Sequence, residues 1–265
     1  MPSRRAATAC LVAVIAAATI GLAACQESDP ERTAALEAWH ADLTAWEAEQ
    51  SAALAPSLVE SVDLTPGPAP ALTPVWPGSE SQDPATADAI NAACTTLTSY
   101  AEQADLAPGP PAVPAGLEPT TAEREQFETA QAALAGLRAG LSEPLSAIRR
   151  YCGTAPTLMT AHAGADLAEA NQAVADALRV QCPVADLAQV CTATIDAAEN
   201  MAADPADAAR IRTDWSSAVA GSGVEELAGL GPQEVEQTLA ELVASRADGA
   251  AQRVHEVATE FEATW

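Results

Sequence analysis

Residues 120–152 read TTAEREQFETAQAALAGLRAGLSEPLSAIRRYC, and this stretch decides the fold of the chain. It opens with Thr120 and Glu123, which have the spacing of a capping box at a helix start. Apolar side chains then recur every seven residues, with others between them: Phe127, Leu134, Leu141 and Ile148, then Leu137, Leu145 and Cys152. This spacing predicts a helix whose apolar stripe packs against other helices. Pro144 predicts a bend within it.

Comparable stripes predict further helices on both sides of this stretch, at about 30–55, 84–107, 187–203, 205–219 and 232–265, with a short turn of helix at 224–229. Another helical element begins at Leu158 and Met159, can be interrupted by Gly164 and resumes through Leu178. Several helix starts place a capping residue before a proline: Asp29-Pro30, Asp83-Pro84, Asp204-Pro205 and Gly231-Pro232. Runs of β-branched and aromatic residues with period two are missing. The sequence therefore predicts an all-α, multi-helix bundle with Pro-rich connectors.

The composition suits a helical protein and excludes nucleic acid as a partner. Hydrophobic residues make up 49% of the chain, but much of this is Ala, which favours helices and buries little area. The formal net charge is −25 and every basic residue is Arg, a bias typical of a high-GC, actinobacterial-type genome. A domain this negative is repelled by nucleic acid and by anionic lipid headgroups.

The first 25 residues have the pattern of an export signal. Arg4 and Arg5 precede an uncharged apolar run from Ala6 to Leu22. A basic start, an apolar middle and small residues before a cleavage site are typical of a secretory signal peptide. The stretch Leu22-Ala23-Ala24-Cys25 resembles the lipobox of bacterial lipoproteins. The resemblance implies that Cys25 is acylated, that the chain is cut before it, and that the mature protein is anchored at the extracytoplasmic face of the cell membrane.

The alternative is an uncleaved N-terminal membrane helix with an incidental cysteine, although about 17 residues is short for a span. Cleavage removes Arg4 and Arg5 and no acid, which changes the formal charge from −25 to −27.

The proline-dense residues 56–83 predict an extended loop or linker, and a second Pro-rich connector covers 108–119. We expect four segments, namely a signal peptide at 1–24, an anchor and first helix at 25–55, a linker at 56–83 and an acidic helical bundle domain at 84–265.

Four further cysteines predict two disulfides, since they are even in number and exported: Cys94, Cys152, Cys182 and Cys191. Three pairings are open. If the helices alternate up and down, Cys152 lies at the end where the 84–107 helix begins, towards Cys94. A metal site or redox pair is the rival interpretation, but the spacing is not CxxC.

The pairing of Cys182 with Cys191 depends on where the next helix begins. A continuous helix from Pro183 would hold the two cysteines about 13 Å apart, which is too far for a bridge. Asp186 and Gln189 have capping-box spacing, however, and start the helix at Leu187. The loop before it can then fold back onto Cys191. We favour Cys94–Cys152 together with Cys182–Cys191.

Known catalytic and metal-binding patterns are sparse. Glu37 and His40 have the ExxH spacing of di-iron bundles, but the other histidines lack the second such pair, so chance explains the match better. No Gly-rich phosphate loop, GxSxG elbow or HExxH motif is present. Carboxylate pairs such as Glu256 with Glu260 are expected from composition and indicate a solvated acidic face. We therefore predict no catalytic residues, no metal and no cofactor.

Trp76 is the one candidate contact residue for a partner protein. It lies in Thr73-Pro74-Val75-Trp76-Pro77, a loop stiffened by proline. The alternative is that this tryptophan docks the loop onto its own bundle. Trp39 and Trp46 recur at helical spacing and indicate buried packing instead.

The first functional hypothesis is a non-enzymatic, lipid-anchored helical protein that binds or supports another component of the cell envelope. The second is a cell-surface enzyme whose site is assembled from scattered carboxylates. The third is a solute-binding lipoprotein of a transporter. Proteins of that third class usually have two α/β lobes around a cleft, which this helical pattern does not resemble.

Overall fold

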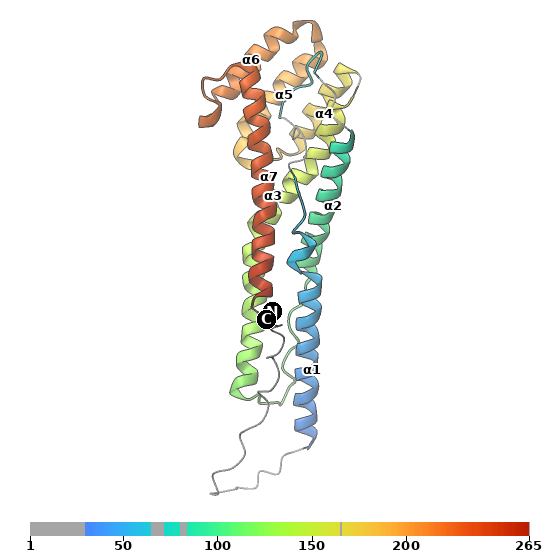
Figure 1. Cartoon of the computed structure of the whole chain (residues 1–265), viewed down its shortest axis with the longest axis vertical. Helices are drawn as coiled ribbons and strands as arrows, with labels where there is room; N and C mark the ends of the chain where they lie inside the picture. The colour runs from blue at the N-terminus through green and yellow to red at the C-terminus, as the bar shows by residue number, and fades with distance from the viewer. Residues whose placement is uncertain (1–29, 65–71, 80–83, 165, 265) are drawn as a thin grey trace, which may run out of the picture.

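The computed structural model of the chain describes residues 30–64, 72–79, 84–164 and 166–264. Across these residues there are seven α-helices and no strand, so the predicted all-α class is confirmed. The helices form an elongated bundle (Figure 1). The predicted signal peptide at 1–24 and the lipidation residue Cys25 lie outside the described residues.

The longest helix, α3 (Thr121–His162), is the spine of the bundle. Its 42 residues correspond to a length of about 60 Å at the usual helical rise. The predicted capping box is present, because Thr120 Oγ1 accepts from the Glu123 N–H and Glu123 Oε2 accepts from the Thr120 N–H. Hydrogen bonds from the Thr120 backbone and side chain to the Glu123 carboxyl lower its pKa. Helix α3 therefore starts where the sequence predicts.

The C-terminal end of α3 lies further along the chain than the sequence predicts. The sequence suggests a helix ending near Cys152 and a new element from Leu158, but α3 continues through Pro144 and Pro156 to His162. A proline inside a helix removes one backbone hydrogen bond. Leu158 and Met159 are fully buried in the core, and their packing holds the last turns in helical form despite that loss. The interruption expected at Gly164 is present, since the next helix begins only after Asp166.

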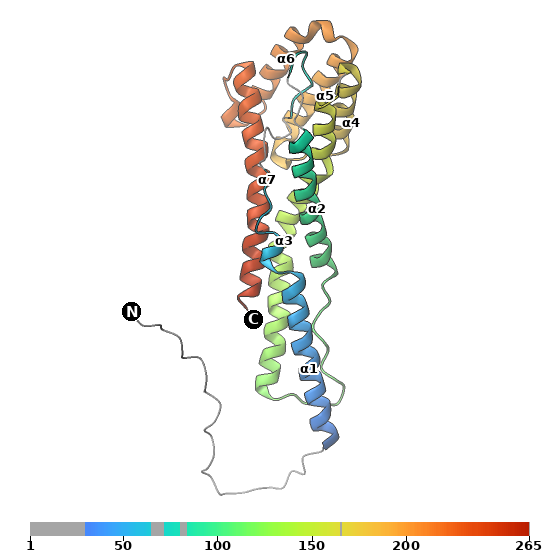
Figure 2. The same ribbon diagram turned by 45° about the vertical axis from the view of Figure 1, so that its right-hand side comes forward.

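Four helices run along the bundle and three form a head at one end (Figures 1 and 2). The long helices beside α3 are α1 (Pro30–Ala53), α2 (Pro84–Leu106) and α7 (Pro232–Glu262). The head contains α4 (Leu167–Val180), α5 (Ala188–Ala203) and α6 (Ala208–Ala220). Short 3-10 turns connect these elements at Pro56–Leu58, Ala185–Leu187, Pro205–Asp207 and Glu225–Leu227. Both α1 and α3 begin at the end of the bundle opposite the head (Figure 2).

The two favoured disulfides are confirmed. Cys94 in α2 is bonded to Cys152 in α3, with 5.4 Å between their Cα atoms. Cys182 is bonded to Cys191, with 5.9 Å between Cα atoms. The second bridge is sterically allowed because Cys182 precedes a loop and the 3-10 turn Ala185–Leu187, and Cys191 lies in the first turn of α5, which begins only at Ala188. The first bridge fixes the two neighbouring helices at the height of the cysteines.

The Pro-rich segments belong to the bundle rather than forming a spacer, as far as they are described. Within 56–83, Val59, Leu64 and Leu72 are buried in the same core as the helices. The connector 108–119 is held against α1 by two tryptophans that the sequence predicts to be buried. Trp39 Nε1 donates to the Pro111 carbonyl at 3.2 Å, and Trp46 Nε1 donates to the Pro108 carbonyl at 3.0 Å.

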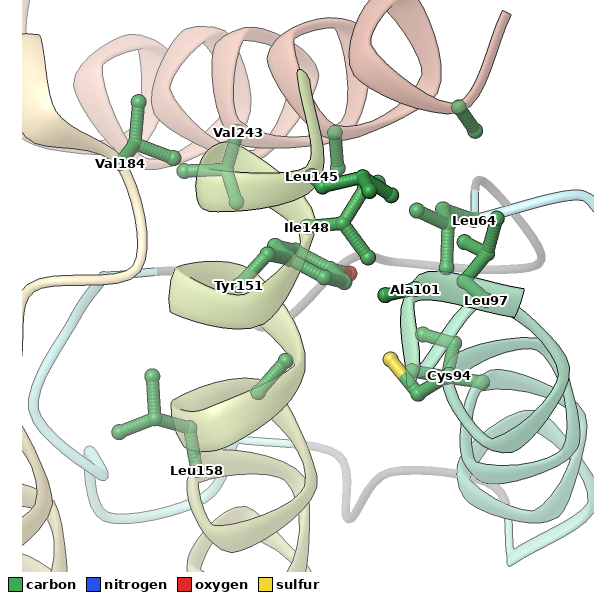
Figure 3. Packing of buried hydrophobic residues seen from close by; sticks show 14 of the residues in the cluster. Leu64, Cys94, Leu97, Ala101, Leu145, Ile148, Tyr151, Leu158, Val184 and Val243 are labelled. Carbon is green, nitrogen blue, oxygen red and sulfur yellow. The ribbon is translucent and has the colours of Figure 1, made fainter. Parts of the chain in front are cut away.

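The middle of the core lies between three helices (Figure 3). Leu145 and Ile148 of α3 lie between Val243 of α7 and Leu97 of α2, with Leu64 from the Pro-rich segment beside them. All five side chains are at most 3% exposed. The described helices include none that is both long and apolar enough to cross a bilayer.

Candidate functional site

Trp76 lies in an extended segment, residues 72–76, which we call the strap. The strap is buried in the head, and the Trp76 side chain is only 5% exposed. Its ring packs edge-to-face on Trp215 of α6 with 5.8 Å between centroids. The Arg212 guanidinium lies 5.6 Å from the Trp76 ring centroid and is itself held by two 2.6 Å hydrogen bonds to Glu236. The side chain therefore docks the loop onto its own bundle and is not available as a contact for a partner.

Buried polar side chains hold the backbone of the strap. Asn171 of α4 is fully buried, and its amide donates to the Val75 carbonyl and accepts from the Val75 N–H, each at 2.9 Å. Thr194 of α5 donates to the Leu72 carbonyl at 2.8 Å and accepts from the Trp215 indole at 3.0 Å. An unpaired backbone group inside a core is costly, so these side chains let an extended segment lie among helices.

His162, at the end of α3, also contacts the strap. Its Nε2 lies 3.1 Å from the Thr73 carbonyl oxygen. Because a carbonyl only accepts, Nε2 carries the proton in this contact. Burial lowers the pKa of His162, an effect that the hydrogen bond to Thr73 partly offsets. The neutral imidazole is therefore the form that fits the head.

A second feature is an open cleft between α3 and α7, which we call the α3–α7 cleft. Its volume is about 800 Å³, which is within the range of small-molecule sites. Helix α3 contributes one wall, helix α7 the other, and the loop between Cys182 and α5 closes one side. The lining residues are Ser142, Glu143, Pro144, Ser146, Ala147, Arg150 and Tyr151, then Pro183, Val184, Ala185 and Asp186, then Ser245, Arg246, Ala247, Gly249, Ala250 and Arg253.

The charge in the α3–α7 cleft differs from that of the whole molecule. Three arginines line it, Arg150, Arg246 and Arg253, against two acids, Glu143 and Asp186. The formal charge of the chain is −25, with acids outnumbering bases by 37 to 12. Arg246 and Arg253 are seven residues apart on α7, so they lie on one face about 10 Å apart. Within the lining alone, arginines outnumber acids by one, while Glu256 and Glu260, which pair with Arg253, add negative charge beside the cleft.

Arg150 stands apart from most other arginines in the described residues because its guanidinium has no partner there. Eight of these arginines bind a carboxylate or a carbonyl: Arg32, Arg138, Arg149, Arg179, Arg210, Arg212, Arg246 and Arg253. The remaining one, Arg124, is also unpaired but is exposed on the first turn of α3. Arg150 is half-buried in a cleft, where a guanidinium loses hydration without gaining a protein partner.

The other candidate residues do not form a catalytic or metal-binding constellation. Glu37 and His40 line a shallow groove along α1 together with Glu123. Within the described residues, no three His, Cys, Asp or Glu side chains are arranged to hold a metal ion. Both disulfides are structural, but residues 183–186, inside the Cys182–Cys191 loop, form one side of the α3–α7 cleft.

The sequence alone did not single out Arg150, Asn171 and Thr194. For Asn171 and Thr194 the signal was a polar residue on an otherwise apolar helical stripe. For Arg150 it was the adjacent pair Arg149-Arg150 in a chain short of bases.

Comparison with protein-family models, with curated proteins and with solved structures finds no match to this chain.

Proposed function

We propose that this chain is a non-enzymatic lipoprotein of the cell envelope, anchored through Cys25 at the extracytoplasmic face, that binds or supports another envelope component. The observation that carries the proposal is the direction of the bundle. Helix α1 begins five residues after Cys25, at the end opposite the head (Figure 2). A lipid on Cys25 would hold that end at the membrane and direct the head outwards.

The length of α3 determines how far the α3–α7 cleft would lie from the membrane. Arg150 lies 29 residues beyond the start of α3, which corresponds to about 44 Å along the bundle. The α3–α7 cleft would therefore be held above the headgroups of the bilayer, open to molecules of the cell wall or to other surface proteins. The strong negative charge supports an upright rod, because the exposed acidic faces are repelled by anionic lipid over about one Debye length.

Site-specific photo-cross-linking in living cells tests this function. A photoreactive amino acid at Ser146, an exposed residue in the α3–α7 cleft, should cross-link to one discrete envelope component. The matched control is the same amino acid at Gln131, which is exposed on α3 outside the cleft. The cross-link from Ser146 should disappear when Cys25→Ala releases the protein from the membrane. Equal background labelling from both positions would contradict the proposal.

A further inference from the structure

Among the residues that the structure describes, none pairs with the Arg150 guanidinium. Acids outnumber bases about three to one in this protein, so a carboxylate partner would be easy to supply. Neither of the two acids that line the cleft forms an ion pair with Arg150. Asp186 pairs with Arg246 at 3.1 Å, while Glu143 is exposed and has no ion pair to Arg150. A half-buried guanidinium facing an open cleft is suited to an acidic group from outside the chain.

The other two arginines of the cleft can add to this attraction. Arg246 and Arg253 are about half exposed, and their ion pairs with Asp186 and Glu256 are of the weak surface type. Such pairs can rearrange around an incoming anion at little cost. The negative charge of the rest of the molecule acts against an anion only over about 10 Å in ordinary salt. Within the cleft, Arg150 is therefore the guanidinium that no carboxylate of the described residues neutralises.

The remaining walls indicate that the ligand is organic rather than a bare ion. Pro144, Val184 and Ala247 line the cleft as largely buried apolar residues, and the partly exposed Ala147 and Ala250 add further apolar surface to its lining. Ser142, Ser146 and Ser245 add hydroxyl groups at its rim. A volume of about 800 Å³ is far larger than a single phosphate or carboxylate needs. The cleft combines apolar walls with a few convergent polar groups, as small-molecule sites do.

We propose that the α3–α7 cleft binds a small organic anion, whose phosphate or carboxylate pairs with Arg150 and whose apolar body lies against Pro144, Val184 and Ala247. This inference rests on the proposed function in one respect, namely that the cleft is the binding surface of the lipoprotein. The acid group could belong to a free metabolite or to a fragment of an envelope polymer. Both sources share the chemistry of an oxyanion attached to a carbon skeleton.

Titration calorimetry with 1-naphthyl phosphate tests the inference on the mature lipoprotein in nanodiscs of zwitterionic lipid, with empty nanodiscs as the blank. We expect saturable one-to-one binding that weakens as salt is raised. Arg150→Gln should lower the affinity at least tenfold. Arg124→Gln, which removes an exposed arginine that is likewise unpaired within the described part of the chain but lies outside the cleft, should change it less than twofold. Thermal unfolding of each variant checks that the fold is kept, and Ser146→Trp, which fills the cleft, should also abolish binding.

Three results would overturn the inference. These are equal binding by the wild type and Arg150→Gln, an equal loss in Arg124→Gln, and equal affinity for the neutral analogue 1-naphthol. Tight binding of inorganic phosphate by itself would overturn the claim that the ligand is organic. Competition by 1-naphthoate would support a site that accepts either a phosphate or a carboxylate. If the wild-type protein does not bind 1-naphthyl phosphate but still cross-links through Ser146 in cells, this inference is rejected and the proposed function stands.

Discussion

At the scale of single residues, Asn171 makes the most demanding contact in the head. Its buried amide satisfies both backbone groups of Val75, so Asn171→Ala would leave an N–H and a C=O unpaired inside the core. We expect a loss of about 2–4 kcal/mol in the free energy of unfolding. Chemical denaturation measures this loss. The control is Gln172→Ala, since Gln172 is exposed and bonds only to Asp176. Equal stability of the two variants would refute the role given to Asn171.

His162 makes the head sensitive to acid. Burial lowers its pKa in the folded state below the ordinary value of about 6.5, so the unfolded chain takes up a proton first as the pH falls. The stability that depends on neutral His162 is full above about pH 6.5 and is lost as the pH decreases towards the lowered pKa. The maximum slope is about 1.4 kcal/mol per pH unit.

Unfolding free energies at pH 7.5 and 5.5 measure this dependence. Relative to the wild type, His162→Gln should lose less stability on acidification, because Gln keeps a donor for the Thr73 carbonyl and does not titrate. Effects of the many carboxylates cancel in this comparison. Gln131→Ala, an exposed substitution on α3 that removes no titratable group, is the control and should keep the pH dependence of the wild type. An identical pH dependence in His162→Gln and the wild type would count against the assignment.

At the scale of elements, the approach of α3 to α7 depends on Gly140. A Cβ added there would lie 3.0 Å from Cγ1 of Val257, a buried residue of α7. Gly140→Leu should therefore overpack the interface and cost about 1–3 kcal/mol of stability. A Cβ added at Gly136, one turn earlier, would meet no atom within 4 Å, so Gly136→Ala should stabilise the helix by about 0.5–1 kcal/mol. Thermal unfolding of both variants provides the measurement, and a stabilised Gly140→Leu would contradict this packing.

The sequence predicts the beginnings of helices better than their ends. The start of α3 follows from Thr120 and Glu123, whose capping contacts are local and therefore visible in the sequence. The continuation of α3 through Pro156 depends on the burial of Leu158 and Met159, which is a tertiary effect. The pairing of Cys182 with Cys191 could be argued from the late helix start that Asp186 and Gln189 indicate. The start is late, but the predicted capping box is wrong, because α5 begins without a side-chain capping bond and Asp186 pairs with Arg246 instead.

The candidate site was much less predictable than the helices. The strap has no periodic pattern, and its partners Asn171 and Thr194 are separated from it by 96 and 122 residues. The sequence singles out Trp76 but cannot decide between docking and exposure, which depends on the pocket formed by α6. The α3–α7 cleft joins residues from three parts of the chain, so only the folded bundle shows that Arg150 has no partner among the described residues.

At the scale of the whole molecule, the proposed function would make the elongated bundle a spacer that is anchored at one end. Two disulfides, an extended α3 and the buried strap give it rigidity along its length. Its acidic surface would keep the sides of an anchored bundle away from anionic lipid. This arrangement would hold the α3–α7 cleft at a defined height, provided that Cys25 carries the lipid.

Mass spectrometry of the N-terminal peptide from protein extracted out of native membranes tests that anchor most directly. We expect the mature chain to begin at Cys25, with a diacylglycerol group on the sulfur. A chain that still begins at Met1, or an unmodified Cys25, would contradict the lipid-anchored function proposed for this protein.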